Sequence, residues 1–179
     1  MRTSKIRVFN TLSWIYVYII RGTPLLMQLF LVYYGLPILL GYAIPAFTTA
    51  LIGLTLYATA YLGEIVKAGL QSVDIGQKEA AKALGMNTIQ EFRYIVFPQT
   101  LPLIIPNAVG FFIALIKDSS LVSAIGFMEL TRSSKLVIAR TFQPFTVYAV
   151  VALIYFIVCY VMSKVSQKVE ERFDILYGK

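Results

Sequence analysis

Three long stretches without a charged residue set the strongest limit on how this 179-residue chain can fold. The first, 22–63, contains 42 residues, and the other two, 94–116 and 141–163, contain 23 each. A helix that crosses a bilayer needs roughly 20 such residues, so the first stretch holds two spans and each of the others holds one. Only 14% of the chain is charged, against roughly a quarter in a soluble domain. We therefore predict an all-α integral membrane protein with about four transmembrane helices.

The predicted segments form a single transmembrane domain over 1–179. Eleven of the sixteen basic residues fall on the side of the N-terminus, the segment after the second span and the C-terminal tail. The positive-inside rule makes that side cytoplasmic. In chain order we expect an amphipathic approach at 1–20, spans at 24–44, 46–66, 98–116 and 145–162, a cytoplasmic elbow at 71–97, an extracytoplasmic segment at 117–143 and a cytoplasmic tail at 164–179.

The composition removes several kinds of chemistry. With no histidine and one cysteine, Cys159, the chain cannot build a disulfide framework, a His- or Cys-based metal site or a Ser-His-Asp nucleophile. No phosphate-binding G-x-x-x-x-G-K-[ST] loop is present, so we expect no catalytic residue, no metal and no cofactor. The net charge of +7 comes from basic residues at the ends of apolar stretches, which favours a membrane over nucleic acid as the reason for it. Any energy must come from a partner subunit or an ion gradient.

The polar segment after the second span carries strong helix signals. Asp74 and Thr88 each begin a capping pattern that ends in Gln or Glu three residues later. Between them, EAAKAL is an excellent helix-forming sequence, and Gly85 is placed to end that helix. We predict a short helix over 75–84, a turn, and a second helix from about 89 that meets the membrane at Pro98.

This segment resembles a known motif. Glu79-Ala80-Ala81, three residues, Gly85, nine residues and then the IVFP of 95–98 are similar to the EAA loop of the permease subunits of bacterial ABC importers. The pattern departs at Phe97, where the family has leucine, and members of the branch carry five spans where we predict four. Further stretches resemble the polar amino acid branch of that family: 21–28, 60–65, 76–77, 98–99, 117–121 and 129–131.

The resemblance implies a fold, partners and a coupling site. It implies a permease subunit that pairs with a second permease subunit, identical or related, and with two ATP-binding subunits that bind the ATP. It also implies an extracytoplasmic amino-acid-binding protein and surrounding membrane lipid. The short helix would dock on the ATP-binding subunit, and the expected coupling residues are Asp74, Gly76, Gln77, Glu79, Ala80, Ala81, Leu84 and Gly85.

The translocation path is predicted from polar and proline residues in the spans. Pro102 and Pro106 each deprive a carbonyl four residues earlier of its donor, which is either a tolerated kink or a polar lining. Glu64 is either half of a structural ion pair with Lys67 or an acidic group that meets a cationic amino acid. The expected path residues are Gln28, Thr59, Glu64, Pro102, Pro106, Asn107 and Asp118.

Three functions compete at this point. The elbow favours the membrane-spanning subunit of an ATP-driven importer of polar amino acids, working by alternating access. A secondary transporter or channel is the alternative, although the sequence has no internal repeat and few intramembrane charges. A non-transporting scaffold would need neither the prolines nor the small residues of the second span. The sequence leaves open which amino acid would be carried.

Overall fold

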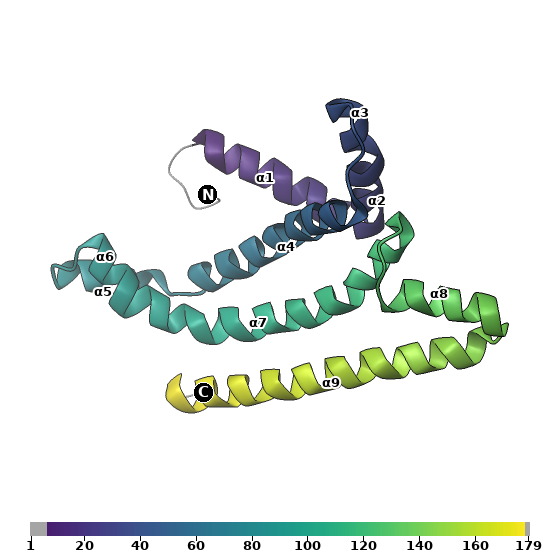
Figure 1. Cartoon of the computed structure of the whole chain (residues 1–179). Helices are drawn as coiled ribbons and strands as arrows, with labels where there is room; N and C mark the ends of the chain where they lie inside the picture. Colours follow the sequence, from purple (N-terminus) through teal and green to yellow (C-terminus); the bar gives the residue numbers. More distant parts are fainter. Residues whose placement is uncertain (1–6, 178–179) are drawn as a thin grey trace. The chain divides into compact units, whose positions relative to one another are not determined.

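The computed structural model describes residues 7–177, and every regular element in that range is helical (Figure 1). Three helices are long and apolar enough to cross a membrane: Ala46–Gln71, Thr88–Ile125 and Pro144–Arg172. A fourth span is present if the bent pair Val8–Gly22 and Leu25–Leu40 counts as one. In chain order the elements are α1 (Arg7–Gly22), α2 (Leu25–Phe30), the π-helix η1 (Leu31–Gly35), α3 (Leu36–Leu40), α4 (Ala46–Gln71), α5 (Ile75–Ala83), α6 (Thr88–Glu91), the π-helix η2 (Phe92–Val96), α7 (Phe97–Asp118), the 3₁₀ helix η3 (Ser119–Ile125), α8 (Leu130–Thr141) and α9 (Pro144–Tyr177).

Two packed units divide these elements. Unit 1 contains Met1–Tyr61 and Ile113–Met162, and unit 2 contains Leu62–Phe112 and Ser163–Lys179. Each unit is described by itself below.

The core of unit 1 joins α2, α4 and η3. Its buried side chains are apolar, and Leu29 of α2 is completely buried. Gly53 of α4 allows this approach, because a Cβ there would lie 2.7 Å from Cδ2 of Leu29. In lipid the hydrophobic effect does not drive helices together. Helices instead pack where small residues let their backbones approach closely. The cluster consists of Leu25, Leu29, Ala50, Val122 and Ile125.

A sharp corner connects α1 to α2 within unit 1. The two arms of the bent pair meet at 109° (Figure 1). Side chains take up carbonyls that the end of α1 leaves unpaired: Thr23 Oγ1 donates to Ile19 O at 2.9 Å, and Gln28 Nε2 donates to Ile20 O at 2.7 Å. Pro24 follows the break, where its missing N–H is no loss. The corner is therefore stabilised by specific side-chain hydrogen bonds.

Unit 2 holds another close helix contact, between the last turns of α4 and the first part of α7. A Cβ on Gly69 would lie 2.8 Å from Cδ1 of Ile104 and 3.6 Å from the carbonyl oxygen of Thr100. Thr100 is completely buried and its hydroxyl donates to Phe97 O. Glycine at position 69 is thus needed for these two helices to touch.

Several helix boundaries differ from the predicted ones. The first span ends at Leu40, before the expected 44, because Gly41 adopts a left-handed conformation at φ +77°. The helix expected from about 89 and the span expected from Pro98 form one continuous helix that begins at Thr88. η2 makes this possible, because Phe97 N–H bonds to Phe92 O, five residues earlier, next to the proline that lacks a donor. The last helix extends from Pro144 to Tyr177, well beyond the expected 145–162.

Candidate functional site

The first half of the elbow is α5, and both of its ends are capped. Asp74 Oδ1 accepts a hydrogen bond from Gly76 N–H at 2.6 Å. At the other end Gly85 has φ +75°, Met86 N–H donates to Ala81 O, and Gly85 N–H donates to Lys82 O. This pair of bonds is the Schellman arrangement that ends helices. α5 ends at Ala83, within one residue of the predicted range.

The second half begins with a reciprocal cap, one residue earlier than predicted. Asn87 Oδ1 accepts from the N–H groups of Ile89 and Gln90, and Gln90 Oε1 accepts from Asn87 N–H at 2.9 Å. The predicted box of Thr88 with Glu91 is therefore wrong. Asn87 is the better acceptor for this position because asparagine ranks above threonine at N-caps.

The elbow turns a mixed apolar and polar surface outward. Ile75, Leu84 and Ile89 are 71%, 78% and 77% exposed. Ala83 is also exposed, whereas Ala81 is only 2% exposed and packs inward. Of the expected coupling residues, Ala81 thus supports the elbow from inside. The others, Asp74, Gly76, Gln77, Glu79, Ala80, Leu84 and Gly85, are exposed.

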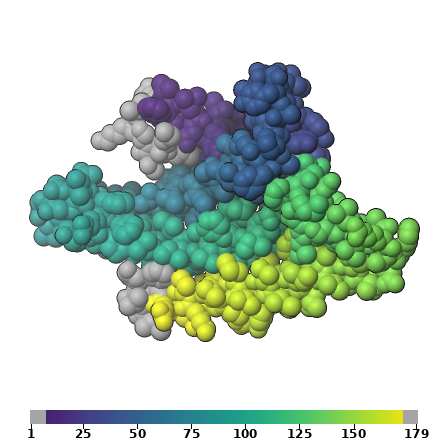
Figure 2. Space-filling view, viewed as in Figure 1, coloured from purple at the N-terminus to yellow at the C-terminus, as the bar shows by residue number. Residues whose placement is uncertain are grey.

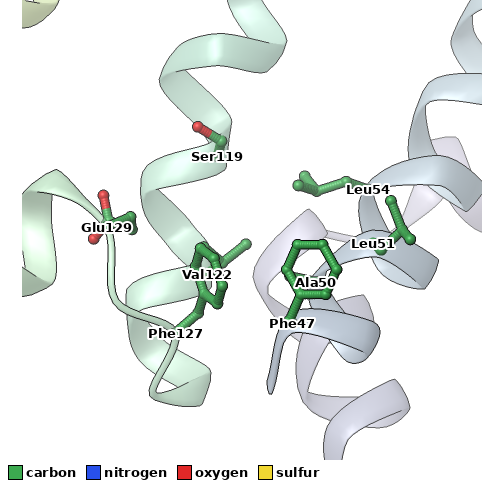
Figure 3. Close-up of a pocket in the computed structure, with 8 residues that line it drawn as sticks. All are labelled: Phe47, Ala50, Leu51, Leu54, Ser119, Val122, Phe127 and Glu129. Atoms are coloured by element: carbon green, nitrogen blue, oxygen red, sulfur yellow. The ribbon is translucent and has the colours of Figure 1, made fainter. Parts of the chain in front are cut away.

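A pocket of about 180 Å³ lies in unit 1 between α4, η3 and the loop that leads to α8 (Figure 3). Most of its wall is apolar, and the rings of Phe47 and Phe127 face each other at a centroid distance of 5.9 Å. Glu129 supplies the ionisable group. The lining residues are Phe47, Ala50, Leu51, Leu54, Ser119, Val122, Phe127 and Glu129.

The carboxylate of Glu129 is held by three donors. As the N-cap of α8, it accepts from Thr131 N–H at 2.8 Å and from Arg132 N–H at 2.6 Å. Tyr155 of α9 donates its hydroxyl to the same side chain at 3.3 Å. These bonds fix the orientation of the carboxylate while it borders the pocket.

The contact with Tyr155 also gives the depth of Glu129. α8 and the first part of α9 form a helical hairpin, and Tyr155 lies eleven residues after Pro144, about 16 Å along the α9 axis. Tyr155 is close to the middle of the uncharged run 141–163. An ionisable group at such a depth is a functional candidate by default. The sequence prediction missed Glu129 as a path residue because it placed all of 117–143 outside the membrane, although the three-residue spacing from Glu129 to Arg132 is that of a helix cap.

Three of the predicted path residues belong to unit 1, and the structure does not bring them together. Gln28 is buried at the α1–α2 corner, where Nε2 donates to backbone carbonyls. Thr59 lies in α4 with its hydroxyl 2.6 Å from Tyr16 Oη. Asp118 directly precedes Ser119 of the pocket. Neither Gln28 nor Thr59 lines the pocket.

The remaining predicted path residues belong to unit 2. Pro102 and Pro106 lie inside α7, which continues through both. Asn107 is exposed, and its Nδ2 donates to Leu103 O at 2.7 Å, within the same helix. Glu64 is partly buried in α4.

Comparison with known proteins extends over nearly the whole chain. The family described as "Binding-protein-dependent transport system inner membrane component" matches residues 3–174. The probable amino-acid ABC transporter permease protein PatM of Vibrio harveyi is 36% identical over 99% of this chain and 80% of its own length. The nopaline transport system permease protein NocM of Agrobacterium fabrum is 39% identical over 95% of this chain and 74% of its own.

A solved structure has the same fold. The crystal structure of an amino acid ABC transporter with histidines superposes with a TM-score of 0.90 at 40% identity, covering 96% of this chain and 80% of that one. This confirms the all-α fold and the resemblance predicted from the sequence.

Proposed function

We propose the function of this chain from its family. The chain belongs to the inner membrane components of binding-protein-dependent transport systems. The chain is the membrane-spanning subunit of an ATP-driven importer of polar amino acids. The match of 96% of this chain to an amino acid ABC transporter carries this proposal. The inner membrane component of such a system is not itself an enzyme, so energy is supplied by ATP that a partner subunit binds.

The elbow is the contact with that ATP-binding partner. Both of its helices are capped, so the elbow can transmit a push where a loop would bend. Ile75 and Leu84 are exposed apolar side chains on a mixed surface, which suits them to a groove on another protein. Gly76, Glu79 and Ala83 share the face of α5 with Ile75 and admit close approach or a polar contact.

The pocket beside Glu129 is a contact for substrate on its way through the membrane. Every free amino acid carries an ammonium group, and the partly buried carboxylate of Glu129 is a suitable partner for it. The apolar wall and the volume of about 180 Å³ fit a solute that is much smaller than a drug-sized ligand. The assembly around this subunit comprises a second permease subunit, two ATP-binding subunits and an extracytoplasmic amino-acid-binding protein.

Reconstitution tests the substrate and the energy source together. The complete complex in proteoliposomes should hydrolyse ATP faster, in a saturable way, when polar amino acids and the binding protein are added. Stimulation by another class of solute alone would contradict the assignment of amino acids. Uptake that follows an ion gradient and ignores ATP would favour a secondary transporter.

A tryptophan substitution tests the elbow. Ala83→Trp fills the outer face of α5 and should lower ATP-driven uptake about tenfold or more, since a lost interface anchor costs at least about 1.4 kcal/mol. The abundance of the permease in the membrane should not change. Ala149→Trp, the same substitution at an exposed position of α9, is the matched control. Normal uptake in the Ala83 variant would remove α5 from the contact with the motor subunit.

A further inference from the structure

The helix α1 has three distinct faces, which differ in what they contact. On the packed face, Val17 is buried and Tyr16 reaches α4. The Tyr16 hydroxyl donates to Leu56 O at 2.5 Å and lies 2.6 Å from Thr59 Oγ1. α1 is therefore fixed to α4 by a defined polar contact.

A second face is an uncovered apolar stripe. Val8, Leu12, Ile15 and Ile19 recur at spacings of four, three and four, which places them in one line along a helix. They are between 41% and 65% exposed. Figure 2 shows α1, in purple, as a surface element.

The third face combines aromatic rings with arginine. Trp14 and Tyr18 stack with ring centroids 5.1 Å apart. Arg21 follows one turn later on the same face, its guanidinium 5.4 Å from the centroid of the Tyr61 ring. Trp and Tyr are enriched at the membrane–water boundary, and arginine is suited to phosphate.

The contact with α4 indicates the depth at which α1 lies. Thr59 precedes Glu64, the first charged residue of α4, by five residues, or about 7.5 Å along the helix axis. Amphipathic helices in the plane of a membrane bury their apolar face about 5–10 Å into the boundary between headgroups and acyl chains. The 109° turn at the end of α1 agrees with a helix that lies along the boundary before the chain enters the bilayer.

The charge of this part of the chain selects the kind of lipid. Residues 1–63 contain four basic residues and no acidic one. An anionic headgroup is the complementary partner, because each basic residue near a negatively charged membrane surface adds about 1 kcal/mol of attraction.

We propose that α1 is an interfacial helix that binds anionic phospholipid, with the stripe from Val8 to Ile19 among the acyl chains and Trp14, Tyr18 and Arg21 at the level of the phosphates. In this arrangement two faces of α1 meet the bilayer, while Tyr16 and Arg21 hold the helix against α4.

Trp14 is the only tryptophan of the chain, so its fluorescence measures the depth of α1. The complete complex is placed in bilayers whose lipids carry bromine either near the carbonyl end or near the terminal methyl of the acyl chains. The emission of a Trp14→Phe complex is subtracted, which removes the tryptophans of the partner subunits. We expect quenching to be strongest with bromine near the carbonyl end. Strongest quenching near the methyl end would mean that α1 lies deep in the bilayer, and absence of quenching would mean that another protein covers it; either result overturns the proposal.

The same signal tests the preference for anionic lipid. Mixed bilayers contain phosphatidylcholine and phosphatidylglycerol, with bromine on one or the other. We expect brominated phosphatidylglycerol to occupy the site beside Trp14 roughly fivefold more readily than brominated phosphatidylcholine. Arg21→Gln should move this ratio toward one, while the control Arg140→Gln, at an exposed arginine at the end of α8, should leave it unchanged. Equal quenching by both lipids in the unsubstituted complex would refute the headgroup preference.

Discussion

A single side chain, Glu129, combines structural and chemical tasks. It caps α8 through two backbone N–H groups, accepts the hydroxyl of Tyr155 and borders the pocket. The cap needs only an oxygen acceptor, whereas attraction for a substrate ammonium needs the negative charge. The two tasks can therefore be separated by substitution.

Replacing Glu129 with glutamine removes the charge and keeps one of the two oxygens that accept from the N–H groups of Thr131 and Arg132, so part of the cap remains. We expect KM for amino acid uptake to rise by about ten- to a hundredfold, since a hydrogen bond to a charged group contributes about 1.5–3 kcal/mol. Uptake by proteoliposomes measures this change. Glu129→Ala should in addition lower the free energy of unfolding by about 1 kcal/mol through loss of the cap. An unchanged KM in the glutamine variant would exclude Glu129 from substrate contact.

For single residues, the sequence predicts the chemical role of a side chain better than it predicts where that side chain lies. The types of the elbow residues were evident from the motif, yet the rotation of α5 about its axis, which buries Ala81 and exposes Ala83, is set by tertiary contacts. Glu129 was missed because charge counting assigns whole segments to one side of the membrane. Charge counting cannot reveal that α8 folds back along α9 and carries the carboxylate to the depth of Tyr155.

At the scale of elements, two π-turns occur in the same relation to a proline. η1 is followed by Leu36 and Pro37, and η2 by Phe97 and Pro98. In each case the carbonyl four residues before the proline lacks its usual donor, and a wider turn lets the helix continue. From sequence, a proline at a helix start and one inside such a helix look alike. The span was therefore predicted to begin at Pro98, whereas the structure has one helix that runs through this proline from Thr88.

The close packing of α2 on α4 can be tested at a glycine. Gly53→Val should lower the free energy of unfolding by roughly 1–3 kcal/mol, because the added side chain overlaps the completely buried Leu29. Thermal unfolding in detergent measures the loss. The control is Gly63→Val in the same helix, where a Cβ meets nothing within 4 Å and only the change in helix propensity remains. Equal effects of the two substitutions would show that the contact at Gly53 contributes nothing.

At the scale of the whole molecule, the distribution of basic residues predicts which parts face the cytoplasm. It predicts that the elbow and the N-terminal segment share the cytoplasmic side and that the segment 117–143 faces the other. The number of membrane-spanning helices could be predicted from the uncharged stretches. The corner between α1 and α2 falls between the approach expected at 1–20 and the span expected from 24, where Arg21 and Pro24 interrupt the apolar run, but its angle of 109° could not be predicted from the sequence.

Cysteine labelling in intact cells tests this topology. In a Cys159→Ala background, a cysteine at Arg140 should react with a membrane-impermeant maleimide added outside, and one at Lys82 should react only after the membrane is opened. Both positions are exposed, so failure to label would not reflect burial. Labelling of both from the same side would contradict the predicted orientation.

The corner at Thr23 and Gln28 has a consequence for the electrical tightness of the membrane. A break in a helix within a bilayer leaves bare carbonyls that attract water, and a file of water molecules conducts protons. Here side-chain donors from Thr23 and Gln28 occupy the carbonyls of Ile19 and Ile20. The chain can thus change direction without leaving these two carbonyls to water, so we expect no proton leak along this corner.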